Sequence, residues 1–127
     1  MASDMRLELI QVPVSDIDRA KAFYEKAGFN VDHDHQVTEH LRFVQLTPPG
    51  SACSIALTSG AHQMKPGSID GLQMVVEDAA ASRTELVERG IEVSDVQVFP
   101  WGSFVFFKDP DGNGWALQAM THRADVA

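Results

Sequence analysis

The chain has 127 residues, of which 44% are hydrophobic and 22% charged, with a net charge of −8 and a single cysteine, Cys53. This length allows one compact domain, and the composition is globular rather than disordered or fibrous. No apolar run approaches the ~20 residues of a membrane-spanning helix, and no N-terminal signal segment is present. One cysteine excludes an internal disulfide or a cysteine-rich zinc site. The acidic balance, without runs of Lys or Arg, argues against nucleic acid as a partner. We expect a cytoplasmic protein that binds neither nucleic acid nor a membrane.

The first half of the chain predicts a strand, a helix and three further strands. Residues 9–16 form a strand that ends in a polar cap, and residues 17–27 carry apolar residues at the spacing of an amphipathic helix. Asp16 is the expected N-cap and Gly28 the expected C-terminal stop. Residues 29–31 open the next strand. Residues 41–46 and 53–58 then predict a hairpin around a Pro- and Gly-containing turn.

The same pattern recurs 62 positions later, so that Asp16 corresponds to Asp78 and Gly28 to Gly90. Here the predicted elements are a strand at 72–78, a helix at 79–89, a strand opening at 91–93, and a hairpin of residues 103–107 and 115–120. The repeat predicts an α+β fold: two βαβββ units that form a curved mixed sheet around a shared cup. We expect one domain over residues 1–127, with unit one at about 5–58, a linker at 59–69, unit two at about 70–120 and a polar tail at 121–127.

Two stretches resemble a known superfamily. Residues 14–29 and 104–113, in this order and within the repeat, are similar to the vicinal oxygen chelate superfamily, which includes glyoxalase I, fosfomycin-resistance enzymes, extradiol dioxygenases and bleomycin-resistance proteins. The resemblance covers about residues 7–120. It implies the fold more than the reaction, because this fold hosts many chemistries.

The metal enzymes of the superfamily hold their ion with His and carboxylate side chains at defined strand positions. The resemblance places these positions at Leu9, Gly71 and Ala116, with the fourth at Ala56 or, with a different turn alignment, at Ser54. Leu, Gly and Ala offer no lone pair to a divalent ion. We therefore expect no metal at the inherited positions and no cofactor.

A short stretch of alternating Asp and His, residues 32–35, looks like a second ligand cluster. Strand alternation places His33 and His35 on one face and Asp32 and Asp34 on the other, so at most two ligands converge. A stable site usually needs three or four, and we interpret this stretch as a solvated strand end. The sequence also lacks a nucleophile elbow and a phosphate-binding loop.

The lining of the cup follows from strand alternation, if Leu9, Gly71 and Ala116 mark its interior. Aromatic and carboxamide side chains then face inward, Trp101 lies on a loop at the rim, and His35 and Arg42 lie at the mouth. The candidate ligand-binding residues are Gln11, His35, Arg42, Phe43, Gln45, Gln73, Trp101, Phe104, Phe106 and Gln118. Such a lining suits an uncharged or aromatic organic molecule. The alternatives are a buried bracket between the units for Gln11 and Gln73, and a place in the core for the two phenylalanines.

Three functions are compatible with these features. The first is a metal-free protein that binds or sequesters a small apolar or aromatic molecule. The second is a lyase, isomerase or dioxygenase of the same fold, with a displaced metal site or none. The third is an interaction module whose own side chains fill the cup. We expect a homodimer, because each sheet leaves open edges that invite pairing. The sequence leaves open whether the units pair within one chain or between chains.

Overall fold

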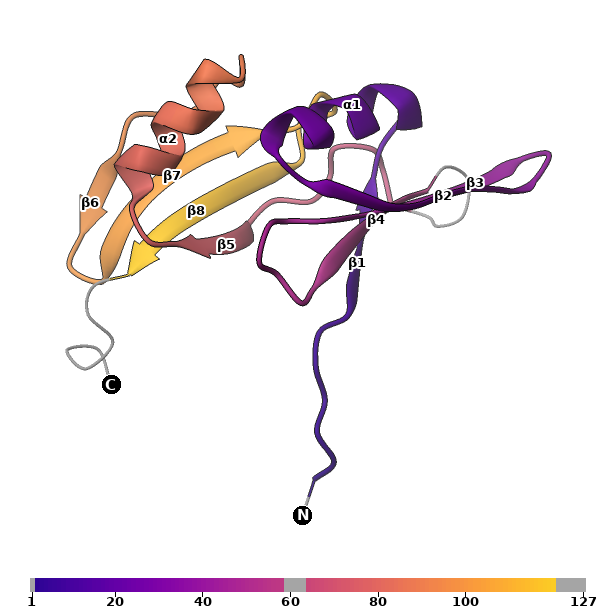
Figure 1. Cartoon of the computed structure of the whole chain (residues 1–127), viewed down its shortest axis with the longest axis horizontal. Helices are drawn as coiled ribbons and strands as arrows, with labels where there is room; N and C mark the ends of the chain where they lie inside the picture. The colour runs from indigo at the N-terminus through magenta and orange to yellow at the C-terminus, as the bar shows by residue number, and fades with distance from the viewer. Residues whose placement is uncertain (1, 59–63, 121–127) are drawn as a thin grey trace.

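The computed structural model describes residues 2–58 and 64–120 (Figure 1). Both predicted units are present, each in the order strand, helix, strand, strand, strand. Unit one consists of β1 (Leu9–Pro13), α1 (Ile17–Ala27), β2 (Asn30–Thr38), β3 (Leu41–Thr47) and β4 (Ser54–Thr58). Unit two consists of β5 (Leu72–Val76), α2 (Ala79–Glu88), β6 (Gln97–Phe99), β7 (Gly102–Lys108) and β8 (Gly114–Met120). The α+β fold class is confirmed.

The described strands form two separate four-stranded mixed sheets, with orders β1-β4-β3-β2 and β5-β8-β7-β6. In each sheet the first strand of the unit pairs parallel with the last, and the other pairs are antiparallel. Both helices lie on the same side of the sheets, as Figure 1 shows. The opposite side of each sheet, which we call the open face, carries no helix.

Both helices begin where the sequence predicts, and α1 also ends where predicted, whereas α2 ends at Glu88, one residue earlier than predicted, with Arg89 as its C-cap. Asp16 and Asp78 are the N-caps, and their carboxylates accept hydrogen bonds from the backbone N–H groups of Arg19 and Ala81, each at 3.1 Å. These bonds satisfy first-turn amides that have no partner within the helix. Gly28 ends α1 with a φ of 108°, a left-handed conformation that a Cβ would strain.

The core lies between the helices and the helix-facing sides of both sheets. It is built from every second residue of the strands, with Val12, Val44, Leu57 and Val105 all fully buried. The burial of these β-branched and leucine side chains is the main stabilising term available to so short a chain.

One predicted strand is not formed where the sequence placed it. Residues 91–96 are irregular, and the strand opens at Gln97 and has only three residues. Ile91 and Val93 are buried in the core instead. In this irregular segment Ser94 makes two hydrogen bonds with the backbone of Phe106 on β7. Its N–H donates to the Phe106 carbonyl at 2.9 Å, and its hydroxyl accepts from the Phe106 N–H. Residues 59–63 of the predicted linker and the tail at 121–127 lie outside the described residues.

A buried polar network joins the two units. The Asp109 carboxylate, in the β7–β8 turn of unit two, accepts a hydrogen bond at 2.8 Å from the hydroxyl of Tyr24 in α1. Trp115 Nε1 donates to the Tyr24 hydroxyl at 2.9 Å. Asn113 Nδ2 donates both to Asp109 Oδ2, at 2.7 Å, and to the carbonyl of Pro13 in β1, at 2.9 Å. Because Tyr24, Asp109 and Asn113 are almost fully buried, each of these bonds also satisfies a group that water does not reach.

The same carboxylate shapes the turn itself. Asp109 Oδ1 accepts three backbone N–H bonds, from residues 111, 112 and 113, at 2.9 to 3.0 Å. Outside the core, Asp111 extends the contact by accepting from the Ser15 hydroxyl at 2.6 Å. The turn motif Asp-Pro-Asp-Gly-Asn therefore holds the units together as well as reversing the chain.

Replacement of Tyr24 by Phe tests this junction. Burial, and then the nearby Asp109 charge, raise the pKa of the Tyr24 hydroxyl above its ordinary value of about 10. Because the unfolded chain ionises this hydroxyl first, its contribution to stability is complete below about pH 10 and declines above it, by up to ~1.4 kcal/mol per pH unit. We expect Tyr24→Phe to lower the free energy of unfolding by about 1–3 kcal/mol at neutral pH.

Urea denaturation at several pH values between about 7 and 11 measures both the stability loss of the variant at neutral pH and the dependence of this loss on pH. The deficit of the variant should shrink above about pH 10, since Tyr24 is the only tyrosine of the chain. A deficit that is absent at neutral pH, or that stays constant to high pH, would contradict the assigned network.

Candidate functional site

The open face of unit two carries residues in register across three strands. Gln73 on β5 lies beside Ala116 on β8, which lies beside Phe106 on β7. One row further, Gln118 lies beside Phe104. Their strand neighbours Trp115 and Leu117 are turned the other way, into the core. The alternation predicted for these side chains therefore holds in the structure.

The open face of unit one repeats this arrangement. Gln11 on β1 lies beside Ala56 on β4, which lies beside Gln45 on β3. Ala56 thus occupies the place in unit one that Ala116 occupies in unit two. The register resolves the alternative left by the sequence, because Ser54 corresponds to Gly114 instead.

The metal positions implied by the resemblance do not fit a divalent ion. The resemblance gives Leu9, Gly71 and Ala116, and the register adds Ala56 as the counterpart of Ala116. These four residues present only aliphatic side chains or none. Within residues 2–58 and 64–120, no three His, Cys, Asp or Glu side chains are grouped so that they could hold a metal ion. The described residues therefore provide no donor set for metal-dependent chemistry on the open face.

Aromatic side chains cover much of the open face of unit two. The rings of Phe104 and Phe106 are parallel, with centroids 6.0 Å apart, and those of Phe99 and Trp101 are parallel at 5.2 Å. Phe99 also meets Phe104 edge to face. Phe106 is 38% exposed and Trp101 52% exposed. Phe104 between them is 9% exposed. Exposed aromatic side chains that lie together are typical of surfaces that contact a ligand or another chain.

The glutamines bond within their own sheets. Gln73 Nε2 donates to Gln118 Oε1, and Gln118 Nε2 donates to the backbone carbonyl of Trp101 at 3.4 Å. In unit one, Gln11 Oε1 accepts from the Thr58 hydroxyl at 3.0 Å. The alternative that Gln11 and Gln73 bracket the two units is therefore not supported. In unit two the amides instead connect β5 and β8 to the loop that carries Trp101.

Unit one presents a more polar open face. His35 lies opposite Phe43 and His33 opposite Gln45, and the two imidazole rings stack with centroids 5.7 Å apart. Asp32 departs from the predicted alternation, because a β-bulge between Val31 and His33 shifts the register. Its carboxylate accepts a hydrogen bond from Thr47, which lowers its pKa.

Arg42 does not lie at the mouth of the cup as expected. Its strand neighbour Phe43 faces the open side, so the Arg42 side chain points toward the helices. There it pairs with Asp18 in α1 at 2.6 Å and with Asp34 at 2.8 Å. Arg42, with Lys21, holds the pKa of Asp34 well below its usual value. Arg42 therefore attaches β2 and β3 to α1 and is removed from the candidate ligand-binding residues.

Sequence reasoning missed three residues of the open face: Val75, Phe99 and His33. Val75 is 63% exposed and lies beside Gln118. It follows Gln73 by two residues, so strand alternation places both side chains on the same face. Phe99 was hidden because the strand that carries it begins later than predicted. The sequence predicts His33 to lie in a solvated strand end, whereas in the structure it shares the face of His35.

The comparisons with known proteins agree with this architecture. Residues 6–117 match the sequence profile of the Glyoxalase/Bleomycin resistance protein/Dioxygenase superfamily. The chain belongs to this superfamily. It is 29% identical to the uncharacterized protein YetH of Bacillus subtilis (strain 168), over 86% of this chain and 93% of YetH.

Two solved structures of the superfamily's fold come from Streptomyces sp. CB03234. TnmS3, an antibiotic binding protein, is 37% identical to this chain, with a TM-score of 0.85 over 95% of this chain and all of TnmS3. A glyoxalase/bleomycin resistance protein is 39% identical, with a TM-score of 0.78 over 89% of this chain and 99% of that protein.

We expect removal of divalent metal to leave the protein unchanged. EDTA should shift the melting temperature by less than about 1 °C, because the inherited positions offer no ligand atoms. Among residues 2–58 and 64–120, the stacked and exposed His33 and His35 are the pair best placed to bind added nickel or zinc weakly. The double variant His33→Ala, His35→Ala is the matched control. Stoichiometric metal retained by purified protein, or stabilisation by metal in that double variant, would contradict the expectation.

Proposed function

We propose that this protein binds a small organic molecule on its open face, without a metal ion at the positions corresponding to Leu9, Ala56, Gly71 and Ala116. The observation that carries the proposal is the aromatic group of unit two, in which Phe99, Trp101 and Phe106 are exposed and pack around Phe104, which is 9% exposed. Parallel rings that are already packed against one another lose little freedom when a flat molecule covers them.

The two units contribute different chemistry to the ligand. Unit two supplies aromatic area and the Gln73 amide, while unit one supplies imidazole, amide and hydroxyl groups from His33, His35, Gln45 and Thr58. Burial of rings provides affinity, and polar groups fix orientation. We infer a flat, uncharged or aromatic molecule with polar substituents along one side.

A second copy of the chain completes the site in this proposal. Exposed apolar side chains continue from the aromatic group along the open side of the molecule, including Val75, Met120, and Leu7 just before β1. β1 and β5 are edge strands, each with one unpaired side. Two copies that pair across these edges would cover the apolar area and enclose a ligand between unit one of one copy and unit two of the other.

The relatives support this choice over catalysis. TnmS3 is an antibiotic binding protein, and binding needs affinity but no catalytic group. Titratable groups are also sparse on the open face of the described strands. Its histidines are exposed, and its amides are not proton-transfer groups at neutral pH.

The ligand is identified by native mass spectrometry of protein purified from its own host, and uncharged naphthol serves as a stand-in probe. We expect Phe106→Ala to weaken binding at least tenfold, because the variant loses both buried area and ring stacking. Because Phe106 is partly exposed in the folded protein, the Phe106→Ala variant should have nearly the same melting temperature as the unmodified protein.

Gln73→Leu provides the contrasting variant. It should alter which ligand is preferred more than it alters stability, since the Gln73 side chain is exposed. If Phe106→Ala and Gln73→Leu both lower the melting temperature sharply while affinity stays constant, these residues are structural and the proposed site is wrong.

The dimer is tested by light scattering at micromolar concentration. We expect a mass of about twice the 13.9 kDa of one chain. Val75→Asp and Leu7→Asp should shift the mass toward one chain, because a buried unpaired carboxylate opposes association. Asp4→Asn, on the exposed segment before Leu7, is the control. A mass of one chain for the unmodified protein would rule the dimer out.

A further inference from the structure

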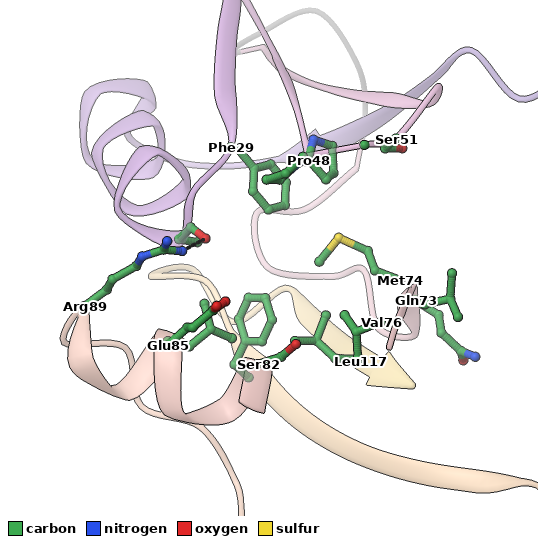
Figure 2. A pocket seen from close by; sticks show the side chains of 16 residues that line it. Phe29, Pro48, Ser51, Gln73, Met74, Val76, Ser82, Glu85, Arg89 and Leu117 are labelled. Carbon is green, nitrogen blue, oxygen red and sulfur yellow. Dashed lines mark hydrogen bonds between the residues drawn. The ribbon is translucent and has the colours of Figure 1, made fainter. Parts of the chain in front are cut away.

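A groove separates the two units on the side away from the aromatic group. Its volume is about 460 Å³, within the range of small-molecule sites. It is bounded by the end of α1, the turn between β3 and β4, the edge strand β5, and α2 (Figure 2). Of the open-face residues only Gln73 and Val75 border it, because β5 is an edge strand, and Phe104, Phe106 and Gln118 do not.

The walls of the groove are apolar and come from both units. Phe29 and Pro48 of unit one lie across from Met74, Val76 and Leu117 of unit two, as Figure 2 shows. These side chains offer a molecule apolar contact on two sides. Such a slot favours an occupant with an apolar body.

α2 turns a polar face toward this apolar slot. Ser82, Glu85 and the C-cap Arg89 line the groove from successive turns, beside the buried Leu86. Amphipathic helices normally place apolar residues on the side facing the protein. Polar residues at this position therefore match an occupant that is itself partly polar.

Of the two charged side chains at the groove, Arg89 has a hydrogen-bond partner within the protein. Its Nη1 donates to the Ala27 carbonyl at 3.1 Å, at the C-terminus of α1, where the helix dipole favours a cation. A Cβ on Gly28 would lie 2.8 Å from the same nitrogen, so the glycine leaves room for this contact.

Glu85 is not compensated. Among residues 2–58 and 64–120, its carboxylate has no hydrogen-bond or ion-pair partner, and Figure 2 shows it pointing from α2 toward the cavity. Glu85 is exposed to solvent, and its carboxylate lies beside an apolar slot whose other charged side chain is Arg89. The net charge of the chain, −8, also attracts cations.

We propose that this groove is a second binding site, separate from the open face, for an apolar molecule that carries one protonated amine. The amine pairs with the Glu85 carboxylate, and the apolar body lies between Phe29 and Pro48 on one side and Met74, Val76 and Leu117 on the other. The inference goes beyond the proposed function, and it stands or falls independently of it.

Three probes with the same indole body test the charge requirement: tryptamine with an amine, tryptophol with a hydroxyl, and indolepropionate with a carboxylate. Binding to the full chain is followed by methyl NMR shifts, which locate the probe at Met74, Val76 and Leu117. We expect tryptamine to bind about two- to fivefold more tightly than tryptophol, as a partly exposed ion pair allows, and indolepropionate to bind most weakly.

Glu85→Gln should abolish the preference for tryptamine over tryptophol, while Glu88→Gln, on the same helix but outside the groove lining, should preserve it. Phe106→Ala should leave groove binding unchanged, which separates this site from the open face. The proposal is overturned if no probe shifts the groove methyls at millimolar concentration. It is also overturned if the amine and alcohol bind equally to the unmodified protein, or if Glu88→Gln removes the preference as fully as Glu85→Gln.

Discussion

The arrangement of the two units depends on the hydrogen bonds that the buried Asp109 carboxylate accepts. A unit of this size buries too little apolar surface to be stable alone, so its helix and sheet must pack against the other unit. Asp109 connects the Tyr24 hydroxyl of α1 with the turn before β8, and Asn113 continues the connection to β1. Because these groups are buried, displacing one unit would leave several of them unsatisfied, at about 1–3 kcal/mol each.

The open face is a consequence of this packing. Both helices lie on one side of the sheets, so every second strand residue faces the side that carries no helix. In unit one these residues are mostly polar, whereas in unit two they include stacked aromatic rings. The fold is symmetric, but its open face is not. This asymmetry lets one fold orient a ligand that has an apolar and a polar side.

Most of the fold could be predicted from local rules. The repeat, the caps Asp16 and Asp78 and the stop at Gly28 are short-range features, and each helix begins where they indicate. Alternation also placed Gln73, Phe104 and Phe106 on the correct face.

The errors arose where a tertiary contact overrides alternation. The sequence predicts that a strand begins at Ile91, but the Ile91 side chain is buried in the core and the residue is not in a strand. The bulge before His33 turned Asp32 toward Thr47. For Arg42 the error was of another kind, because alternation from Phe43 itself places this side chain on the helix side, where it pairs with Asp18 and Asp34. Neither a bulge nor a partner on a distant element leaves a periodic signal in the sequence.

The crystal structure of the protein with its co-purified molecule tests the central claim most directly. We expect density stacked on Phe104 and Phe106, with unit one of a second copy closing over it. Density in the inter-unit groove alone, or an open face filled by the chain's own residues, would contradict the account.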